Sequence, residues 1–285
     1  MSTTVFRWMS TRLPRVEKSV APPTEKLRQP SGSVHLVGAG CGDPELLTLK
    51  AARTIASAEV LVYDRLVSPE IVALAGRNCQ KIYVGKRCGE HTLSQEAIIE
   101  LLIQHANTGA KVVRLKGGDP YVFGRGSEEL TALRAQGIAT GVCPGITAAL
   151  GCSASAGIPI THRGLSNGCL FLTGRLRDGS IPIESLDVDL HSLTLVIYMG
   201  VRGLPRIVKA LKEKGLAEDW PVALIENGST DAERTLVSDL ENICQDADTH
   251  DIGAPALLMV GRTVAHNHST KGMVQAQHAQ LSERA

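Results

Sequence analysis

Short apolar runs alternate with amphipathic stretches through the first half of this chain. The runs are typical of strands covered on both faces, and they lie at residues 34–37, 59–63, 81–84, 112–115 and 140–143. Apolar residues spaced by three and four positions predict the intervening helices, which lie at residues 46–58, 69–75, 94–107 and 127–136. Strands and helices that alternate in this way predict a parallel α/β sheet.

The second half has a different pattern, which follows a small-residue helix predicted at residues 148–156. Hairpin-like polar stretches separate the elements predicted there, which are strands at residues 169–173, 194–199 and 256–260 and an amphipathic helix at residues 204–214. We therefore expect an α/β fold of two α/β domains, residues 31–150 and residues 151–266. A ligand cleft is expected between them, because small-molecule sites favour domain interfaces.

The two ends of the chain lack this regularity. Residues 1–30 hold four arginines and four prolines without sustained periodicity, and no acidic residue precedes Glu17. We interpret residues 1–30 as a disordered leader, with an organellar transit peptide as the alternative. Residues 267–285 are polar and are expected to form a loose tail.

The composition limits the class of partner. The 285 residues include 30 basic and 29 acidic side chains, for a net charge of +1. No basic run is interleaved with aromatic residues, so we expect no nucleic-acid partner. No apolar run approaches the roughly 20 residues that span a bilayer, so we expect no membrane partner.

The seven cysteines are scattered, and none forms a Cys-x-x-Cys pair. A zinc knuckle or a dithiol redox site therefore has no support. An odd number of cysteines without a secretory signal fits the reduced thiols of a cytoplasmic protein. No cluster of His, Cys and Asp suggests metal ligands, and we expect no metal.

Two glycine-rich loops follow predicted strands. The strand at residues 112–115 runs into Gly117-Gly118-Asp119-Pro120, where the absence of Cβ atoms lets backbone approach a ligand. Residues 38–43 read Gly-Ala-Gly-Cys-Gly-Asp, which fails the Gly-x-Gly-x-x-Gly dinucleotide pattern because Asp43 stands where a glycine is needed. A nicotinamide dehydrogenase is therefore only a weak alternative.

Charged residues follow three predicted strands, at Asp64-Arg65, at Lys86-Arg87 and at Asp119. The carboxyl ends of parallel strands lie along one edge of a sheet, where open α/β sheets bind ligands. Solvated loop charge is the alternative for any one of them. Arg125 continues this edge just before a predicted helix that carries Glu128.

Four blocks of the sequence together resemble one family, the uroporphyrinogen-III C-methyltransferases within the wider tetrapyrrole methylases. The blocks are residues 37–48, residues 63–67 with 84–87, residues 113–129 and residues 144–163. The resemblance extends from about Ser33 to Ala265. One departure is Cys41, which replaces the proline of the family's Gly-Ala-Gly-Pro-Gly-Asp and leaves the rigidity of that loop in doubt.

The resemblance implies transfer of methyl groups from S-adenosylmethionine to two pyrrole carbons of uroporphyrinogen III. The products are precorrin-2, which feeds sirohaem, cobalamin and haem d1, and S-adenosylhomocysteine. It also implies two α/β domains flanking a cofactor cleft, usually in a homodimer. Because the sulfonium methyl is electrophilic and the pyrrole carbon electron-rich, positioning supplies much of the acceleration and no metal is needed.

Position-by-position agreement with the family motifs implies the site residues. The cofactor would contact Cys41, Gly117, Gly118, Asp119, Val122, Thr147, Ala148, Met199, Gly228 and Ala256. The tetrapyrrole would be bound through its carboxylates by Arg65, Arg87 and Arg163. The residues implied in catalysis are Asp64, Lys86, Arg125 and Glu128. Two alternatives stay open, because Asp64 could anchor pyrrole N–H groups instead of accepting a proton and Met199 could be core filler.

Three other functions compete with this one. A precorrin methylase that acts later in cobalamin assembly would share the fold, but residues 64–66 with 85–87 argue against it. A catalytically inactive binding subunit is disfavoured by the intact residues 117–119 and 147–148. Fused bifunctional enzymes carry a long N-terminal domain, and only about thirty residues precede the match here. We therefore expect precorrin-2 oxidation and iron insertion to be absent.

Overall fold

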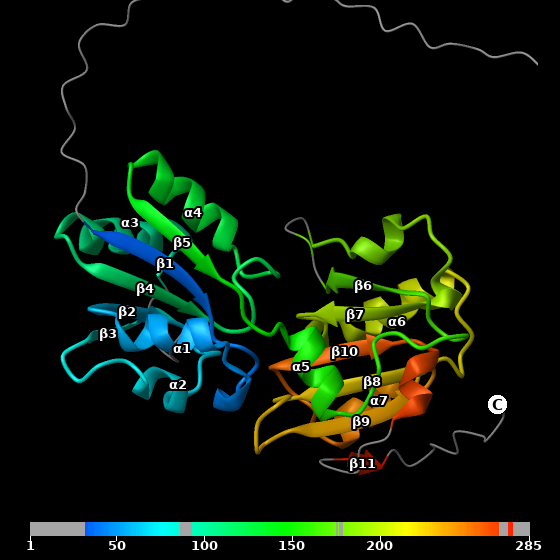
Figure 1. Cartoon of the computed structure of the whole chain (residues 1–285). Coiled ribbons are helices and arrows are strands. Elements are labelled where there is room, and N and C mark those ends of the chain that lie inside the picture. Colours follow the sequence, from blue (N-terminus) through cyan, green and yellow to red (C-terminus); the bar gives the residue numbers. More distant parts are fainter. Residues whose placement is uncertain (1–31, 86–92, 175, 177–178, 268–272, 276–285) are drawn as a thin grey trace, which may run out of the picture.

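The computed structural model describes residues 32–85, 93–174, 176, 179–267 and 273–275. These residues form two lobes, each built on one β-sheet, and helix α5 (Ala148–Ser155) lies between them (Figure 1). The predicted α/β fold is confirmed. The predicted leader and most of the predicted tail lie outside the described residues.

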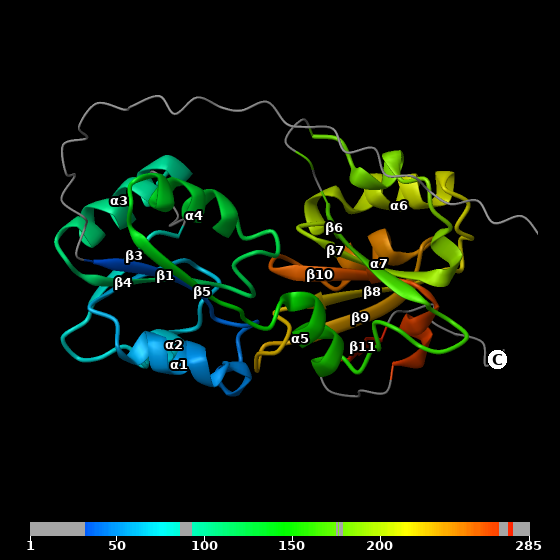
Figure 2. The ribbon, with the colours of Figure 1, turned by 45° about the horizontal axis from the view of Figure 1, so that its top comes forward.

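The first sheet has five parallel strands in the order β3-β2-β4-β1-β5. The strands are β1 (Ser33–Gly38), β2 (Val60–Tyr63), β3 (Gln80–Tyr83), β4 (Lys111–Lys116) and β5 (Ala139–Cys143). Two helices cover each face of this sheet (Figure 2), α1 (Leu49–Ala56) with α2 (Pro69–Ala73) and α3 (Gln95–Asn107) with α4 (Gly126–Ala135). Because the strands run the same way, the loops that follow them lie along one edge.

Side-chain caps determine where two of these helices begin. Thr48 Oγ1 accepts the backbone N–H of Ala51 at 3.1 Å, and residues 44–46 form a separate 3-10 helix. The helix predicted from residue 46 therefore begins at Leu49, after this cap. Ser94 Oγ accepts the backbone N–H of Ala97 at 3.2 Å, so the predicted cap of α3 is confirmed.

The second sheet is mixed, with the strand order β11-β9-β8-β10-β7-β6. Its strands are β6 (Gly168–Thr173), β7 (Leu193–Tyr198), β8 (Pro221–Glu226), β9 (Arg234–Asp239), β10 (Ala256–Val260) and β11 (Met273–Gln275). Strand β10 is antiparallel to both β7 and β8, whereas β6–β7 and β9–β11 pair in parallel. Three residues of the predicted loose tail therefore form a strand.

The hairpin of β8 and β9 was not predicted, although the stretches between strands were described as hairpin-like. Val222 to Ile225 is a fully buried apolar run, which is the same signal that predicted the strands of the first sheet. The second sheet is accompanied by helices α6 (Leu204–Glu213) and α7 (Ile243–Thr249). Short 3-10 helices lie at Pro44–Leu46, Pro182–Ser185, Leu190–Ser192, Val201–Gly203 and Arg262–His266.

Mostly aliphatic side chains fill the cores on both faces of both sheets, in a chain with only three Phe, four Tyr and two Trp. Helices α6 and α7 pack on one face of the second sheet, and α5 packs on the other through Ala149 and Cys152. The predicted boundary between residues 150 and 151 falls within α5 and stays a prediction. No helix in the described part of the chain is both long and apolar enough to cross a membrane.

Candidate active site

Backbone from three loops of the first sheet packs together with no side chain between. Gly40 N donates to Gly118 O at 3.2 Å, and Gly118 N donates to Gly40 O at 2.6 Å. A Cβ atom on Gly38 would lie 2.6 Å from both Gly118 O and Gly145 Cα, so no larger residue fits there. The loops after β1, β4 and β5 are therefore held against one another by close backbone contact.

Asp119 holds the loop after β4 in place. Its Oδ1 accepts the backbone N–H of Tyr121 at 2.8 Å, and its Oδ2 accepts that of Gly145 at 3.0 Å. Beside it, Gly118 has φ +68°, and an added Cβ would meet no atom closer than Thr147 Cα at 3.8 Å. A side chain at Gly118 would therefore occupy the space that separates this loop from the start of α5, and glycine leaves that space free.

Three of the predicted cofactor residues converge from the second sheet. Met199 follows β7, Gly228 lies just after β8, and Ala256 begins β10. Because β10 runs antiparallel to β7 and β8, its first residue lies at the same edge as their last ones, and Ala256 pairs with Glu226. Met199 is 61% exposed, so the alternative that it fills the core is wrong.

Two contacts join this edge to the first domain. The rings of Phe123, after β4, and Tyr198, at the end of β7, lie 4.9 Å apart. Cys41 Sγ, after β1, donates to Ser229 Oγ at 3.2 Å. Burial raises the pKa of the Cys41 thiol, which keeps its proton available for this bond. The loops that hold Cys41 and Val122 thus contact the second sheet and the loop after β8, and the cofactor roles of these two residues stay predictions.

Tyr198 is a residue that the sequence reasoning missed. Its hydroxyl accepts the backbone N–H of Ala149 at 2.9 Å and pairs with Thr147 Oγ1 at 2.6 Å. Thr147 makes no side-chain cap of its own, so a tyrosine from the end of β7 caps α5. Burial raises the pKa of Tyr198. The sequence offered only its position before Met199 as a signal.

Asp64 lies at the end of β2, with 27% of its side chain exposed. Its Oδ1 accepts the backbone N–H of Leu66 at 3.2 Å. It borders a cavity of about 350 Å³, whose other lining residues are Tyr63, Arg65, Val67, Pro69, Val72 and Tyr83. Lys86, which was predicted to act in catalysis, and Arg87, which was predicted to bind substrate, lie outside the described residues.

The predicted cationic residues that are described lie on the surface. Arg125 forms a forked pair with Glu128, from Nε to Oε1 at 3.0 Å and from Nη2 to Oε2 at 2.7 Å. This pairing raises the pKa of Arg125. Arg65 and Arg163 are exposed, and Arg163 lies apart from the first sheet, in the segment between α5 and β6.

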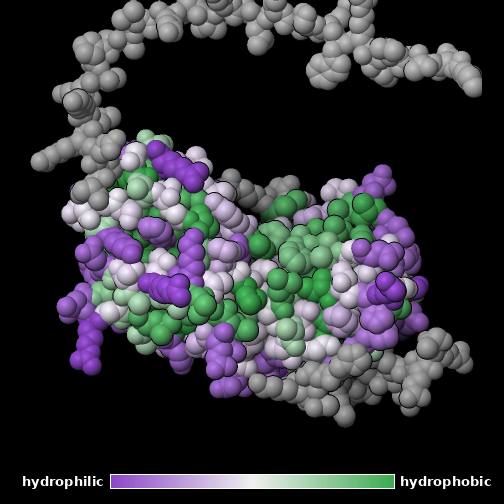
Figure 3. Space-filling view, viewed as in Figure 1, coloured by the Kyte–Doolittle hydropathy of each residue, from purple (hydrophilic) through white to green (hydrophobic). Residues whose placement is uncertain are grey.

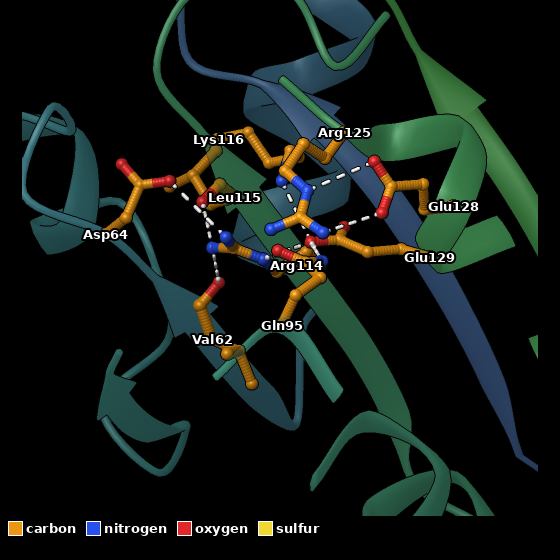
Figure 4. A network of polar contacts seen from close by, with 9 residues as sticks. All are labelled: Val62, Asp64, Gln95, Arg114, Leu115, Lys116, Arg125, Glu128 and Glu129. Carbon is orange, nitrogen blue, oxygen red and sulfur yellow. Dashed lines mark hydrogen bonds and ion pairs between the residues drawn. The ribbon is translucent and has the colours of Figure 1, made fainter. Parts of the chain in front are cut away.

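A buried charged cluster connects Asp64 to α4, and the sequence reasoning assigned it no role (Figure 4). Arg114 and Lys116 lie on β4, and Glu129 Oε1 accepts from Lys116 Nζ at 2.9 Å and from Arg114 Nε at 3.4 Å. Arg114 Nη2 also pairs with Asp64 Oδ2 at 3.4 Å. Burial lowers the pKa of Lys116, an effect that nearby Arg114 reinforces. Alternation along β4 was a usable signal, since Val112, Arg114 and Lys116 share one face.

No group of three or more His, Cys, Asp or Glu side chains that could hold a metal ion occurs among the residues that the structure covers. The candidate site therefore consists of glycine-rich backbone, a capped helix start, carboxylates and arginines. Such a site can bind and orient a polar cofactor and an anionic second molecule, and it can exchange protons at Asp64.

The chain matches the family described as Tetrapyrrole (Corrin/Porphyrin) Methylases over residues 33–244. A siroheme synthase from Azotobacter vinelandii is 51% identical over 233 residues, which are 82% of this chain and 50% of that protein. A siroheme synthase from Acinetobacter baylyi is 48% identical over 236 residues, which are 83% of this chain and 52% of that protein. The chain thus spans about half the length of the curated relatives it matches.

Solved structures agree with this match. The native form of a uroporphyrin III C-methyl transferase from Thermus thermophilus is 41% identical, with a TM-score of 0.67 over 81% of this chain and 93% of that one. The Thermus thermophilus enzyme complexed with S-adenyl homocysteine is 42% identical, with a TM-score of 0.68 over 82% of this chain and 99% of that one. A cobalt precorrin-4 methyltransferase shares the fold. It is 22% identical, with a TM-score of 0.72 over 82% of this chain and 96% of that one.

Proposed function

Because the chain belongs to the tetrapyrrole (corrin/porphyrin) methylases, we propose that it is a uroporphyrinogen-III C-methyltransferase. It transfers methyl groups from S-adenosylmethionine to two pyrrole carbons of uroporphyrinogen III and forms precorrin-2. The observation that carries this proposal is the convergence of Gly118, the start of α5 and the Met199–Gly228–Ala256 edge. Relatives named for this activity and for siroheme synthesis support it.

The residues at this convergence fit an adenosyl cofactor. Space is free beside Gly118, and Gly117 precedes it on the same loop. The sulfonium of S-adenosylmethionine supplies an electrophilic methyl group. Thr147 and Ala148 form the start of α5, Asp119 keeps lone pairs for an ammonium group, and Met199 projects from the opposite edge. These residues fix the direction from which the methyl carbon faces a second molecule.

The carboxylates of the substrate require cationic side chains in the site. Because the net charge of the chain is only +1, these cations must be local to the site. Exposed Arg65, Arg125 and Arg163 can each donate two parallel hydrogen bonds to a carboxylate. We assign Arg65 and Arg163 to substrate binding, together with Arg87. Glu128 orients Arg125 through their forked pair. Cations from the loops of the first sheet and from the segment after α5 thus hold the carboxylates of the tetrapyrrole.

Asp64 and Lys86 are proposed to handle protons. After a pyrrole carbon gains a methyl group, the ring must lose a proton to restore a neutral product. Asp64 Oδ1 and Oδ2 each hold one neighbouring donor, and the side chain still reaches solvent. It can therefore accept that proton or bind pyrrole N–H groups, and the two roles predict different kinetic losses when the charge is removed.

A homodimer is the proposed assembly, and we place the protein in the cytoplasm on its cysteine usage. Apolar side chains gather over α5 and the neighbouring strands of the second sheet (Figure 3), and Leu150 on α5 is 53% exposed. Burial of this face against a second copy would remove it from water. Light scattering at micromolar concentration should give twice the chain mass, and a monomer would overturn this assembly.

The methylation proposal is tested with purified protein, uroporphyrinogen III and S-adenosylmethionine, without added metal. We expect two methyl groups per tetrapyrrole and two equivalents of S-adenosylhomocysteine. Chelator should leave the rate unchanged. If S-adenosylhomocysteine binds but uroporphyrinogen III gains no methyl group, another tetrapyrrole is the acceptor and the proposal is wrong.

A further inference from the structure

A line of charged side chains runs from the interior of the first domain to the edge of the site. Glu129 is fully buried, Arg114 and Lys116 are 3% and 4% exposed, and Asp64 at the end of the line is partly exposed. The two cations and the two carboxylates balance. Figure 4 shows Arg114 placed between Asp64 and Glu129.

Stability alone does not explain this cluster. Removing ionic groups from water costs free energy that their mutual attraction often only offsets, and apolar replacements of similar volume are often as stable. The rest of the same core is aliphatic. Glu129 Oε1 takes three donors, from Arg114, Lys116 and Gln95, whereas Oε2 has no partner among the described residues. The carboxylate is thus arranged to hold donors on one side only.

The guanidinium of Arg114 is fixed by several acceptors. Its Nη1 donates to the backbone oxygen of Leu115 at 3.0 Å and reaches that of Val62 at 3.5 Å. Its Nε faces Glu129 at 3.4 Å. The remaining group, Nη2, points to Asp64 Oδ2 at 3.4 Å. Because the planar guanidinium is held in this way, the direction of its hydrogen bond to Asp64 is fixed.

We propose that Arg114 is a positioning residue for Asp64, and that Glu129 holds Arg114 in the orientation this requires. Leu66 N orients one oxygen of Asp64 and Arg114 orients the other, so the carboxylate is set before substrate arrives. This inference rests on the proposed role of Asp64 in methylation. Preorganised charged groups of this kind matter because small displacements at a reacting centre lower the rate strongly.

A double-mutant cycle tests the inference in the full-length protein. The variants are Arg114→Gln, Asp64→Asn and the double variant, with kcat and substrate KM measured for uroporphyrinogen III. We expect Arg114→Gln to change the same parameter as Asp64→Asn, by roughly tenfold in the wild-type background. In the Asp64→Asn background the loss should shrink to less than about threefold, because the positioned group is gone. Equal losses in both backgrounds would overturn the inference.

Arg114→Lys covers the case in which Arg114→Gln does not fold. Lysine keeps the buried positive charge opposite Glu129 but lacks the forked geometry that also reaches Asp64. We expect a folded protein with unchanged affinity for S-adenosylhomocysteine and a loss of roughly tenfold in the Asp64-dependent parameter. Full activity in Arg114→Lys would mean that Arg114 serves only charge balance, and would overturn the proposal.

Arg134→Gln is the matched control. It removes a 3.0 Å hydrogen bond from α4 to Thr140 and touches neither Glu129 nor Asp64. Its kinetic effect should be the same in the wild-type and Asp64→Asn backgrounds, and a dependence on Asp64 would contradict the chain of contacts proposed here. If the wild-type protein methylates uroporphyrinogen III but Asp64→Asn is fully active, the positioning role fails and the proposed function stands.

Discussion

The two sheets bring residues to the site in different ways. All five strands of the first sheet are parallel, so every loop that follows a strand lies at the same edge of the sheet. In the second sheet, Met199 and Gly228 follow strands, whereas Ala256 precedes one. These three residues meet only because β10 runs against β7 and β8. In a parallel sheet, the positions of the strand ends in the sequence are therefore sufficient to locate a site. In a mixed sheet, the directions of the strands must also be known.

The edges also differ in chemistry. The first sheet contributes Asp64, Arg65 and Arg125, and it extends its charge inward through the cluster at Arg114. The second sheet contributes an aromatic hydroxyl, a thioether and backbone. We infer that the first edge carries substrate recognition and proton handling, while both edges hold the cofactor. The following variants test this division, from the largest expected effect to the smallest.

Gly118→Val should abolish most cofactor binding. The side chain would fill the open space beside α5, and φ +68° is strained for a branched residue. We expect the affinity for S-adenosylhomocysteine to fall by roughly a hundredfold, about 3 kcal/mol, in calorimetry. Gly137→Val is the control for strain, because Gly137 has φ +72° and no atom within 4 Å of an added Cβ. Unchanged affinity in a folded Gly118→Val would remove this loop from the site.

Replacing Arg125 or Arg163 by Leu should weaken substrate use and spare the cofactor. Charge-assisted hydrogen bonds contribute roughly 1.5–3 kcal/mol, so kcat/KM should fall about tenfold to a hundredfold. Lys209→Leu, which removes an exposed, ion-paired cation on α6, is the control and should leave kcat/KM unchanged. A parallel loss of S-adenosylhomocysteine affinity in either variant would show that the replaced arginine also serves the cofactor, and would contradict its assignment to substrate recognition.

Cys152, on the face of α5 that packs against the second sheet, should make stability depend on alkaline pH. Burial raises its pKa from 9.0 to about 12, so the unfolded thiol ionises first as the pH rises. The free energy of unfolding then falls above pH 9, by about 2 kcal/mol between pH 9 and 11 from this group. Urea titrations at several pH values should show that the free energy of unfolding of Cys152→Ala falls less steeply with pH than that of the wild type. Cys169 is exposed, so Cys169→Ala should keep the wild-type dependence on pH. Identical slopes in all three proteins would contradict the burial effect.

Tyr198→Phe should lower stability modestly. The backbone N–H of Ala149 and the hydroxyl of Thr147 would lose their shared partner. We expect a loss of about 1–2 kcal/mol in the free energy of unfolding. Tyr121→Phe, at a residue that is 57% exposed, should change it by less than about 0.5 kcal/mol. Equal losses of unfolding free energy in the two variants would mean that the Tyr198 cap does not stabilise α5.

Sequence patterns predicted the first domain well because its strands are short apolar runs separated by regular helices. The loops at Gly118 and Asp64 could be placed on one edge for the same reason. The second domain was predicted less completely, since the direction of β10 and the β8–β9 hairpin depend on pairing between distant segments. Tyr198 and the Glu129 cluster were missed because each acts through a partner on another element, which local patterns do not record.

A crystal structure of the protein with S-adenosylhomocysteine tests the central claim, that two differently built edges form one cofactor site. We expect the ligand beside Gly117 and Gly118 and against Thr147. Its other side should contact Met199, Gly228 and Ala256, with the sulfur facing the side where Asp64 and Arg125 lie. A ligand that contacts the first sheet alone, or that lies away from Gly118, would contradict the account.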